Sequence, residues 1–218
     1  MKSTIPNGNA NTAFRPACLT QEIGRQSNMS TQLRPDEPLA PRHPLPRSAQ
    51  VDRDDYLLDL CRGKQVLHLA CAAWPATKMW CEDGSLLHLR LLEVAARCAG
   101  FDWSEPGLNV LESHGVNDLH RLNLLDANQV EAGWQDMGFA PDLVIAGELL
   151  EHLDRAGIVL ENCRRFMKPD SKLVITVPNA FSVRGLLHVL RGYEKVAPDH
   201  VAYYSYSNVR ELVERNGF

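Results

Sequence analysis

From Gln50 onward the chain alternates short apolar runs with longer amphipathic stretches. The clearest apolar runs are QVLHLA (65–70), DLVIAG (142–147) and KLVITV (172–177), and each has the length of a buried strand. Because parallel strands need helical crossovers between them, this alternation predicts an α/β fold with helices on both faces of the sheet. Right-handed crossovers then favour a doubly wound, Rossmann-like parallel sheet.

Two weaker strands are expected, one ending at residue 102 and one over 119–124. Amphipathic spacing, glycine stops and the Lys168-Pro169 break predict the helices. These helices span 51–63, 85–98, 104–113, 149–167, 182–192 and 207–217, and 127–137 is either a loop or a helix.

The first 48 residues have a different composition from the rest. Seven of the thirteen prolines fall before residue 48, where missing amide donors and restricted φ angles discourage both helix and sheet. The sequence therefore predicts a disordered, proline-rich arm over 1–48 and a folded domain over 49–218. An excess of Arg over acidic residues leaves an organelle transit peptide open for the arm, and a docking segment is the other alternative.

Charge and cysteine usage exclude several classes of protein. The net charge is −4 and no basic stripe is present, which argues against a nucleic-acid partner. No apolar run approaches the roughly 18 residues of a membrane span, so no membrane partner is expected. Six scattered cysteines without a C-x-x-C pair indicate reduced thiols, and hence a cytoplasmic protein. A small molecule is the default partner.

Unusual residues follow the predicted strand ends. Ligands of doubly wound sheets bind outside the carboxyl ends of the strands, which lie along one edge. We therefore expect the following residues to converge: Ala70–Trp74, Asp102, Asn123, Gly147–His152 and Pro178-Asn179.

Five segments occur in an order and spacing that resemble the class I S-adenosylmethionine-dependent methyltransferases. They are VLHLACA, GFDWSEPGLNVLESHG, PDLVIAGELLEHL, MKPDSKLVITVPN and PDHVAYYSYSNVRELVERNGF. The resemblance covers residues 65–218 and is nearest to the branch that includes quinone-biosynthesis O-methyltransferases. It implies a sheet with strand order 3-2-1-4-5, S-adenosylmethionine as the cofactor, and methyl transfer to an oxygen or nitrogen of a small-molecule acceptor.

The resemblance implies that the turn after the first strand holds the methionine part of the cofactor, through His68, Ala70, Cys71 and Ala72. In the family this turn is glycine-rich, because the cofactor lies directly on the backbone. Here Ala70, Ala72 and Trp74 stand at the glycine positions, and His68 stands where an acid is usual. Weaker cofactor binding, a shifted loop and a lost activity are the open outcomes.

The second and fourth strand ends supply the other implied cofactor contacts. Asp102 matches the acid that accepts hydrogen bonds from the ribose, and Trp103 can pack on the adenine. Asp102 or Ser104 can equally cap the following helix. Asn123 matches a polar residue near the adenine. Gly147 and Glu148 complete the implied cofactor site at the end of the fourth strand.

The GELLEHL stretch lines the acceptor side in the family. The resemblance implies His152 and His200 as catalytic residues that accept a proton from an attacking hydroxyl. If 149–167 is one helix, Glu148 and His152 share a face. Some members of the superfamily with E-x-x-E-H and a distant His bind a divalent cation, which implies a metal site at Glu148, Glu151, His152 and His200. The alternative is that the E-H pair only seals the helix start.

Residues near the chain end concern the acceptor lip and the sheet edge. Pro178-Asn179 resembles the strand-ending turn that shapes the substrate lip, and a tyrosine cluster is either a lid or a core seal. The sequence stops at NGF, where family members continue into strands 6 and 7. Either the sequence is a fragment, or the protein has a five-strand core in which these terminal strands are missing. In the second case a sixth or seventh strand would come from the arm or from a second subunit in a homodimer.

Two rival functions remain at this stage. A non-catalytic binding or scaffolding protein with this fold and a degenerate cofactor loop is the first. A nicotinamide-dependent oxidoreductase is the second, and it is disfavoured because no G-x-G-x-x-G follows the first strand.

Overall fold

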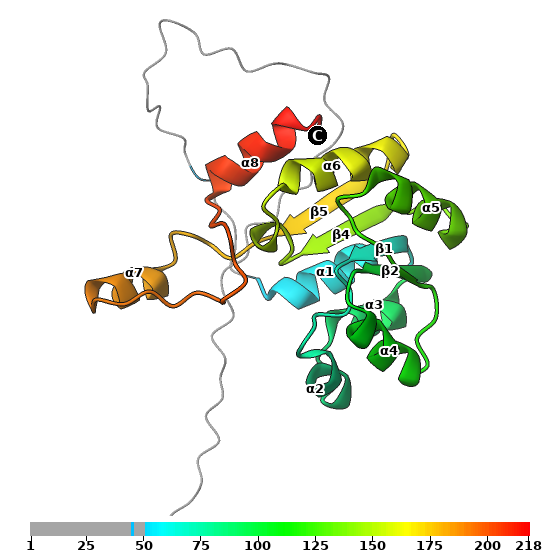
Figure 1. Ribbon diagram of the computed structural model, residues 1–218, viewed down its shortest axis with the longest axis horizontal. Coiled ribbons are helices and arrows are strands. Elements are labelled where there is room, and N and C mark those ends of the chain that lie inside the picture. Colours follow the sequence, from blue (N-terminus) through cyan, green and yellow to red (C-terminus); the bar gives the residue numbers. More distant parts are fainter. Residues whose placement is uncertain (1–44, 46–50) are drawn as a thin grey trace, which may run out of the picture.

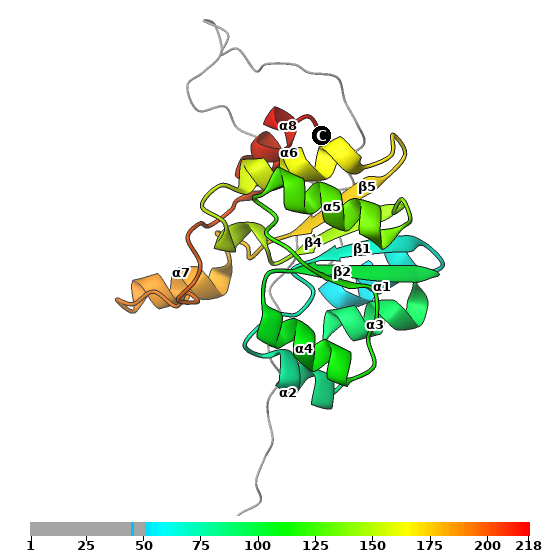
Figure 2. The same ribbon diagram turned by 45° about the vertical axis from the view of Figure 1, so that its right-hand side comes forward.

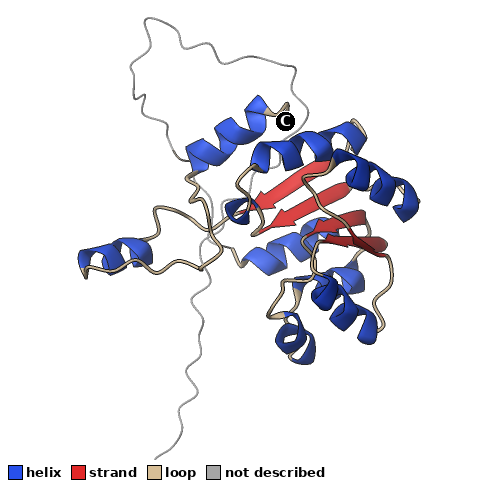
Figure 3. Ribbon diagram, in the orientation of Figure 1, coloured by secondary structure: helices blue, strands red, loops and turns tan. Residues whose placement is uncertain are grey.

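The computed structural model describes Leu45 and residues 51–218, so nearly all of the expected arm over 1–48 lies outside the described residues. Five parallel strands form one sheet in the order β3-β2-β1-β4-β5, as the sequence predicts. Figure 3 shows the strands in red between the blue helices. The strands are β1 Gln65–Leu69, β2 Arg97–Asp102, β3 Leu119–Arg121, β4 Leu143–Gly147 and β5 Lys172–Thr176.

Helices cover both faces of this sheet (Figures 1 and 2). One face packs against α1 (Arg53–Cys61) and α3 (Leu87–Val94), and the other packs against α5 (Ala127–Met137), α6 (Ala156–Phe166) and α8 (Tyr206–Arg215). Neighbouring strand residues alternate between the two cores, because side chains of a strand point to opposite faces. Leu67 and Val144 join the core under α5 and α6, whereas Val66 and Leu143 join the core under α1 and α3.

The remaining helices lie toward the β3 side or away from the sheet. Helices α2 (Thr77–Glu82) and α4 (Glu105–Ser113) pack together with the loop after β1, and their core includes Cys71 and Leu108. Helix α7 (Val183–Leu190) projects away from the body of the molecule (Figures 1 and 2). None of the described helices is long and apolar enough to cross a membrane.

The predicted helix over 85–98 is too long. Helix α3 stops at Val94, whose carbonyl oxygen accepts a hydrogen bond from Gly63 N–H (2.8 Å), and β2 already begins at Arg97. Gly63 has a φ of 68°, which favours glycine and turns the chain out of α1. The parallel ladder with β1 therefore takes residues that the amphipathic pattern had assigned to the helix. Helix α2 has no counterpart in the sequence-based prediction.

The predicted helix over 149–167 is also wrong, and this error matters for the site. A 3-10 turn over Leu150–His152 comes first, and α6 starts only at Ala156. Glu148 precedes the turn with a φ of 50°, and Leu153 after it is extended. Glu148 and His152 therefore do not lie on one face of a helix.

Candidate active site

The ends of β1, β2 and β4 meet at one edge of the sheet. Leu69 lies in register with both Phe101 and Ala146, so the residues after these three strands emerge side by side. Ala70 N–H donates to the Phe101 carbonyl (2.7 Å), and Ala72 N–H donates to Asp102 Oδ2 (2.8 Å). The loop after β1 is thus held directly against the end of β2, as the sequence predicts.

Alanines replace the expected glycines in this loop at a limited cost. Ala70 and Ala73 have φ angles of 55° and 52°, a conformation that costs an L-residue about 1 kcal/mol or more. Ala72 is fully buried, and a Cβ at Gly107 of α4 would lie 2.8 Å from its methyl group. Ala72 stands where the family has a glycine, and Gly107 of the facing helix α4 leaves room for its methyl group. The Ala72 methyl therefore packs against α4.

Both carboxylate oxygens of Asp102 accept hydrogen bonds from backbone amides at the edge of the sheet. Its Oδ2 accepts from Ala72 N–H and its Oδ1 accepts from Ser104 N–H (2.7 Å). Ser104 is the residue that caps α4, because its Oγ accepts from Gly107 N–H. Each carboxylate oxygen has a second lone pair, so Asp102 can still accept hydrogen bonds from a ribose.

Trp103 and Asn123 behave differently from each other. Trp103 is exposed at the end of β2, with the Arg121 guanidinium 5.8 Å from its ring centre. Asn123 makes hydrogen bonds within its own turn. Its Oδ1 accepts from Leu125 N–H, and its backbone N–H donates to Gln129 Oε1. Trp103 is therefore free to stack on a ligand, whereas Asn123 shapes the turn before α5.

His68 faces a second histidine in the core under α3. His68 and His88 are both buried, and their Nδ1 atoms lie 3.3 Å apart, so one imidazole donates to the other. Burial lowers the pKa of His68 well below its ordinary value, with the charge of His88 as a further cause. Burial also lowers the pKa of His88 to about 4. Sequence reasoning missed this pair, although His88 lies on the apolar side of its helix.

Cys71 and Gly147 contribute little polar chemistry to the edge. Cys71 is buried with the α2 and α4 core, and burial raises the pKa of its thiol. A Cβ at Gly147 would lie 3.6 Å from Thr176 Oγ1, an ordinary contact. Neither residue presents a charged or strongly hydrogen-bonding group to a ligand.

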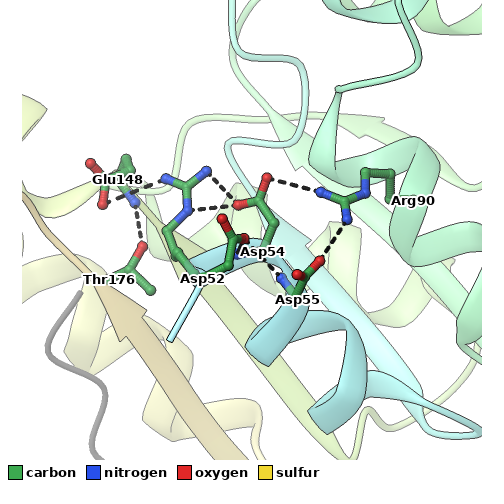
Figure 4. Close-up of polar contacts among 7 residues, drawn as sticks. Asp52, Asp54, Asp55, Arg90, Glu148 and Thr176 are labelled. Carbon is green, nitrogen blue, oxygen red and sulfur yellow. Dashed lines mark hydrogen bonds and ion pairs between the residues drawn. The ribbon is translucent and has the colours of Figure 1, made fainter. Parts of the chain in front are cut away.

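Glu148 takes part in a charged network that the sequence did not indicate (Figure 4). Its N–H donates to the Thr176 carbonyl (2.9 Å), and its Oε1 lies 3.7 Å from Nη1 of Arg53. Arg53 opens α1 and also pairs with Asp54 (2.7 Å), which in turn pairs with Arg90 (3.1 Å). A guanidinium from the start of the folded domain therefore reaches the end of β4.

Three of the four residues expected to bind a metal lie together. One ligand atom from each of Glu151, His152 and His200 lies within 4.8 Å of the others, and Glu148 is not part of this group among the described residues. The His152 and His200 rings meet edge to face, with centres 4.6 Å apart. His152 Nδ1 lies 3.0 Å from Asp199 Oδ2, a partner that sequence reasoning missed.

Glu151 is the least satisfied polar group of this region. Its side chain is buried, and neither carboxylate oxygen has a hydrogen-bond partner among the described residues. Burial is the main cause that raises the pKa of Glu151 to about 7, and the nearby charge of Glu148 adds to it. Such a carboxyl needs a proton, a cation or a ligand donor to be stable.

A returning segment of the chain packs against Glu151 and the residues after β5. Val201 and Ala202 donate their N–H groups to the Glu151 carbonyl (2.8 and 3.2 Å), and Tyr204 forms a parallel bridge with Asn179. Tyr204 packs against the core, whereas Tyr193 and Tyr203 are exposed. Tyr204 therefore seals the core, which is one of the two roles that the sequence left open for the tyrosine cluster.

Comparisons with known proteins agree on one family. The family of methyltransferase domains matches residues 37–218. The ubiquinone biosynthesis O-methyltransferase of Shewanella halifaxensis is 24% identical over 203 residues, covering 89% of this chain and 80% of that relative. The ubiquinone biosynthesis O-methyltransferase of Coxiella burnetii is 24% identical over 162 residues, which cover 72% of this chain and 64% of the Coxiella enzyme.

Solved structures share the fold at low sequence identity. A methyltransferase of Thermotoga maritima, described as a possible histamine N-methyltransferase, gives a TM-score of 0.53 at 12% identity, covering 76% of this chain and 69% of that one. An S-adenosylmethionine-dependent methyltransferase of Aquifex aeolicus gives a TM-score of 0.50 at 16% identity, covering 76% and 79%.

Proposed function

The chain belongs to the class I S-adenosylmethionine-dependent methyltransferases, and from this premise we propose that it methylates an oxygen of a small-molecule acceptor. A nitrogen acceptor is the alternative. The choice of oxygen rests on the curated relatives, which are described as O-methyltransferases. The observation that carries the proposal is the meeting of the β1 loop, Asp102 and Glu148 at one edge of the sheet. Family membership excludes the oxidoreductase alternative.

The residues at this edge fit the chemical groups of the cofactor. Asp102 has lone pairs left for the ribose hydroxyls, and exposed Trp103 offers a surface for the adenine. Arg53 brings a guanidinium to the end of β4, where it suits the one carboxylate of the cofactor. The Ala72 methyl packs into α4 and so leaves the loop backbone open to a ligand.

The chain's own contribution to the reaction is alignment and proton transfer. When bound, S-adenosylmethionine supplies a methyl group on a positively charged sulfur, so the leaving group is already activated. The protein has to orient the acceptor oxygen and exclude water. With Nδ1 directed at Asp199, His152 keeps Nε2 free to accept the proton of an acceptor hydroxyl. His200 is the second candidate for this step.

Calorimetry with S-adenosylhomocysteine tests the proposal. We expect saturable binding by the full chain and a loss of at least about tenfold in affinity for Asp102→Asn, because the uncharged amide accepts hydrogen bonds from the ribose more weakly. A folded chain that does not bind S-adenosylhomocysteine would support the non-catalytic alternative. A methylation screen against small-molecule extracts then identifies the acceptor.

A divalent cation at Glu151, His152 and His200 is an alternative proposal for the acceptor side, in which His152 binds the ion rather than the proton. The observation that favours it is the buried Glu151 carboxyl without a partner. Carboxylate and imidazole ligands suit Mn²⁺ or Zn²⁺, and such an ion would orient acceptor oxygens. We expect Mn²⁺ to raise the thermal midpoint of the wild type and to leave Glu151→Gln unchanged. Equal midpoints with Mn²⁺ and with excess chelator would contradict the proposal.

Location in the cytoplasm is also a proposal. The five described cysteines are all free and buried, and burial raises the pKa of Cys61, Cys98 and Cys163 to about 12. Unpaired thiols of this kind support a reducing compartment.

A further inference from the structure

Asp54 in the first turn of α1 is a buried carboxylate to which the proposed function gives no role. Its side chain is 4% exposed, although that of its neighbour Asp55 is 72% exposed. Two guanidinium groups contact it: Arg53 Nε donates to Asp54 Oδ1 (2.8 Å), and Nη1 of Arg90 in α3 donates to Asp54 Oδ2 (3.1 Å) (Figure 4). A buried carboxylate needs such donors, so these contacts fix the Asp54 side chain between α1 and α3.

Asp54 determines the direction of the Arg53 guanidinium. Asp54 Oδ1 contacts both Nε and Nη2 of Arg53 (2.8 and 2.7 Å). Because the guanidinium is planar and rigid, fixing these two nitrogens also fixes the third, Nη1. Nη1 is directed toward Glu148, whose Oε1 lies 3.7 Å away (Figure 4). Asp54 therefore orients Arg53 toward the end of β4.

The start of α1 shows why Arg53 needs this partner. The N-terminus of a helix carries a partial positive charge, which disfavours a cation and favours an anion in the first turn. Arg53 is the first residue of α1, and Asp52 caps the helix through Oδ1, which accepts from the N–H groups of Asp54 and Asp55 (3.0 and 3.2 Å). The cap fixes the backbone of Asp54, and the Asp54 carboxylate offsets the unfavourable position of Arg53.

The Arg53 and Glu148 side chains lie close together without a hydrogen bond between them. The 3.7 Å between Nη1 and Oε1 exceeds the range of N–H···O hydrogen bonds. Glu148 has its own anchor, since its N–H donates to the carbonyl and to Oγ1 of Thr176 (2.9 and 3.2 Å). A cation and an anion that are anchored separately at this spacing suit a zwitterion, whose carboxylate would bind Arg53 and whose ammonium would bind Glu148. The amino-acid part of S-adenosylmethionine is such a zwitterion.

We propose that Asp54 is a positioning residue for cofactor binding, which holds the Arg53 guanidinium in the orientation that the carboxylate of S-adenosylmethionine requires. The inference rests on the proposed function, because it needs the amino-acid part of the cofactor to bind next to Glu148. Asp54 acts through Arg53, since one of its oxygens contacts Arg53 and the other contacts Arg90. Removal of Arg90 would leave the contact between Asp54 and Arg53 intact.

Calorimetry with two ligands tests this role. S-adenosylhomocysteine carries the amino-acid part, and 5′-methylthioadenosine has the same nucleoside without it. We expect Asp54→Asn to weaken the binding of S-adenosylhomocysteine by about threefold, because a neutral amide oxygen holds a guanidinium less firmly than a carboxylate does. Its affinity for 5′-methylthioadenosine, measured by displacement of bound S-adenosylhomocysteine, should be unchanged. Asp54→Asn should have no further effect in Arg53→Ala protein, which has no guanidinium to position.

Asp55→Asn is the matched control, because it makes the same chemical change on the next residue, whose carboxylate pairs with Arg90 (3.1 Å). It should bind both ligands like the wild type. An equal loss of affinity for both ligands in Asp54→Asn would mean a general change in the fold and would overturn the proposal, as would an unchanged affinity for S-adenosylhomocysteine. Wild-type protein that binds neither ligand would overturn the proposed function as well, so the two failures can be told apart.

Discussion

The candidate site has two sides, the edge around Asp102 that we propose holds the cofactor (the cofactor edge) and the region around Glu151 that we propose holds the acceptor (the acceptor side), and they are built in opposite ways. At the cofactor edge, Asp102 has amide donors on both oxygens and the loop packs closely against α4. On the acceptor side, Glu151 is buried without a hydrogen-bond partner among the described residues, and His152 meets an exposed Asp199. Removing a polar group should therefore destabilise the first region and stabilise the second.

Asp102→Ala should have the largest effect. It leaves the amides of Ala72 and Ser104 buried without acceptors, at about 1 to 3 kcal/mol each, so unfolding free energy should fall by about 4 kcal/mol. Urea denaturation measures this loss. Asp126 is the matched control, because it also accepts from two amides but is only partly buried at the start of α5, and Asp126→Ala should cost only about 1 kcal/mol. If Asp102→Ala and Asp126→Ala lost the same unfolding free energy, the buried amides at Asp102 would not be the cause of its larger effect.

The His68 and His88 pair predicts acid sensitivity of the cofactor edge. The folded pKa of His88 is about 4, below its ordinary unfolded value, so the unfolded chain binds the proton more tightly. This contribution to stability is present above about pH 6.5 and is lost as pH falls toward 4, by about 3 kcal/mol. As pH falls from about 6.5 to 4, the unfolding free energy of His88→Gln should decrease less steeply than that of the wild type. An unchanged slope would contradict the prediction.

Glu151→Gln should stabilise the protein, in contrast to Asp102→Ala. The pKa of Glu151 is raised to about 7, so its ionisation disfavours the folded state as pH rises from its ordinary value through 7. We expect a gain of about 1 kcal/mol at pH 8 and none at pH 4, measured by urea denaturation without added metal. A loss of stability at pH 8 would mean that the carboxylate has a favourable partner.

Arg53→Ala should have the smallest effect and should act on binding rather than on folding. Arg53 is only partly buried, so its pairs with Asp54 and Glu148 are worth little in stability. If it holds the cofactor carboxylate, affinity for S-adenosylhomocysteine should fall about fivefold in calorimetry. Arg90→Ala is the control, because it contacts Asp54 but does not reach Glu148. Equal affinity of wild type and Arg53→Ala would place the carboxylate elsewhere.

Errors in the sequence-based prediction occur where two local signals compete. The apolar spacing of residues 85–98 suits a helix, but the ladder between β1 and β2 takes Arg97 and Cys98 as strand. The run after Glu148 also suits a helix, but the positive φ at Glu148 and the 3-10 turn interrupt it. Apolar periodicity predicts which side of a helix or strand is buried. It does not predict the residue at which contacts with a neighbouring element terminate that helix or strand.

The sequence by itself determined the parallel sheet, its strand order and the edge where the strand ends meet. The sheet and its edge follow from alternating apolar runs and crossover geometry, which are properties of short segments. The strand order followed from the resemblance of the motifs to the family. Only the tertiary structure decided that Arg53 reaches Glu148, that His68 pairs with His88, and that His200 joins Glu151. Such contacts join residues far apart in the chain, and no local pattern encodes the packing that brings them within reach of each other.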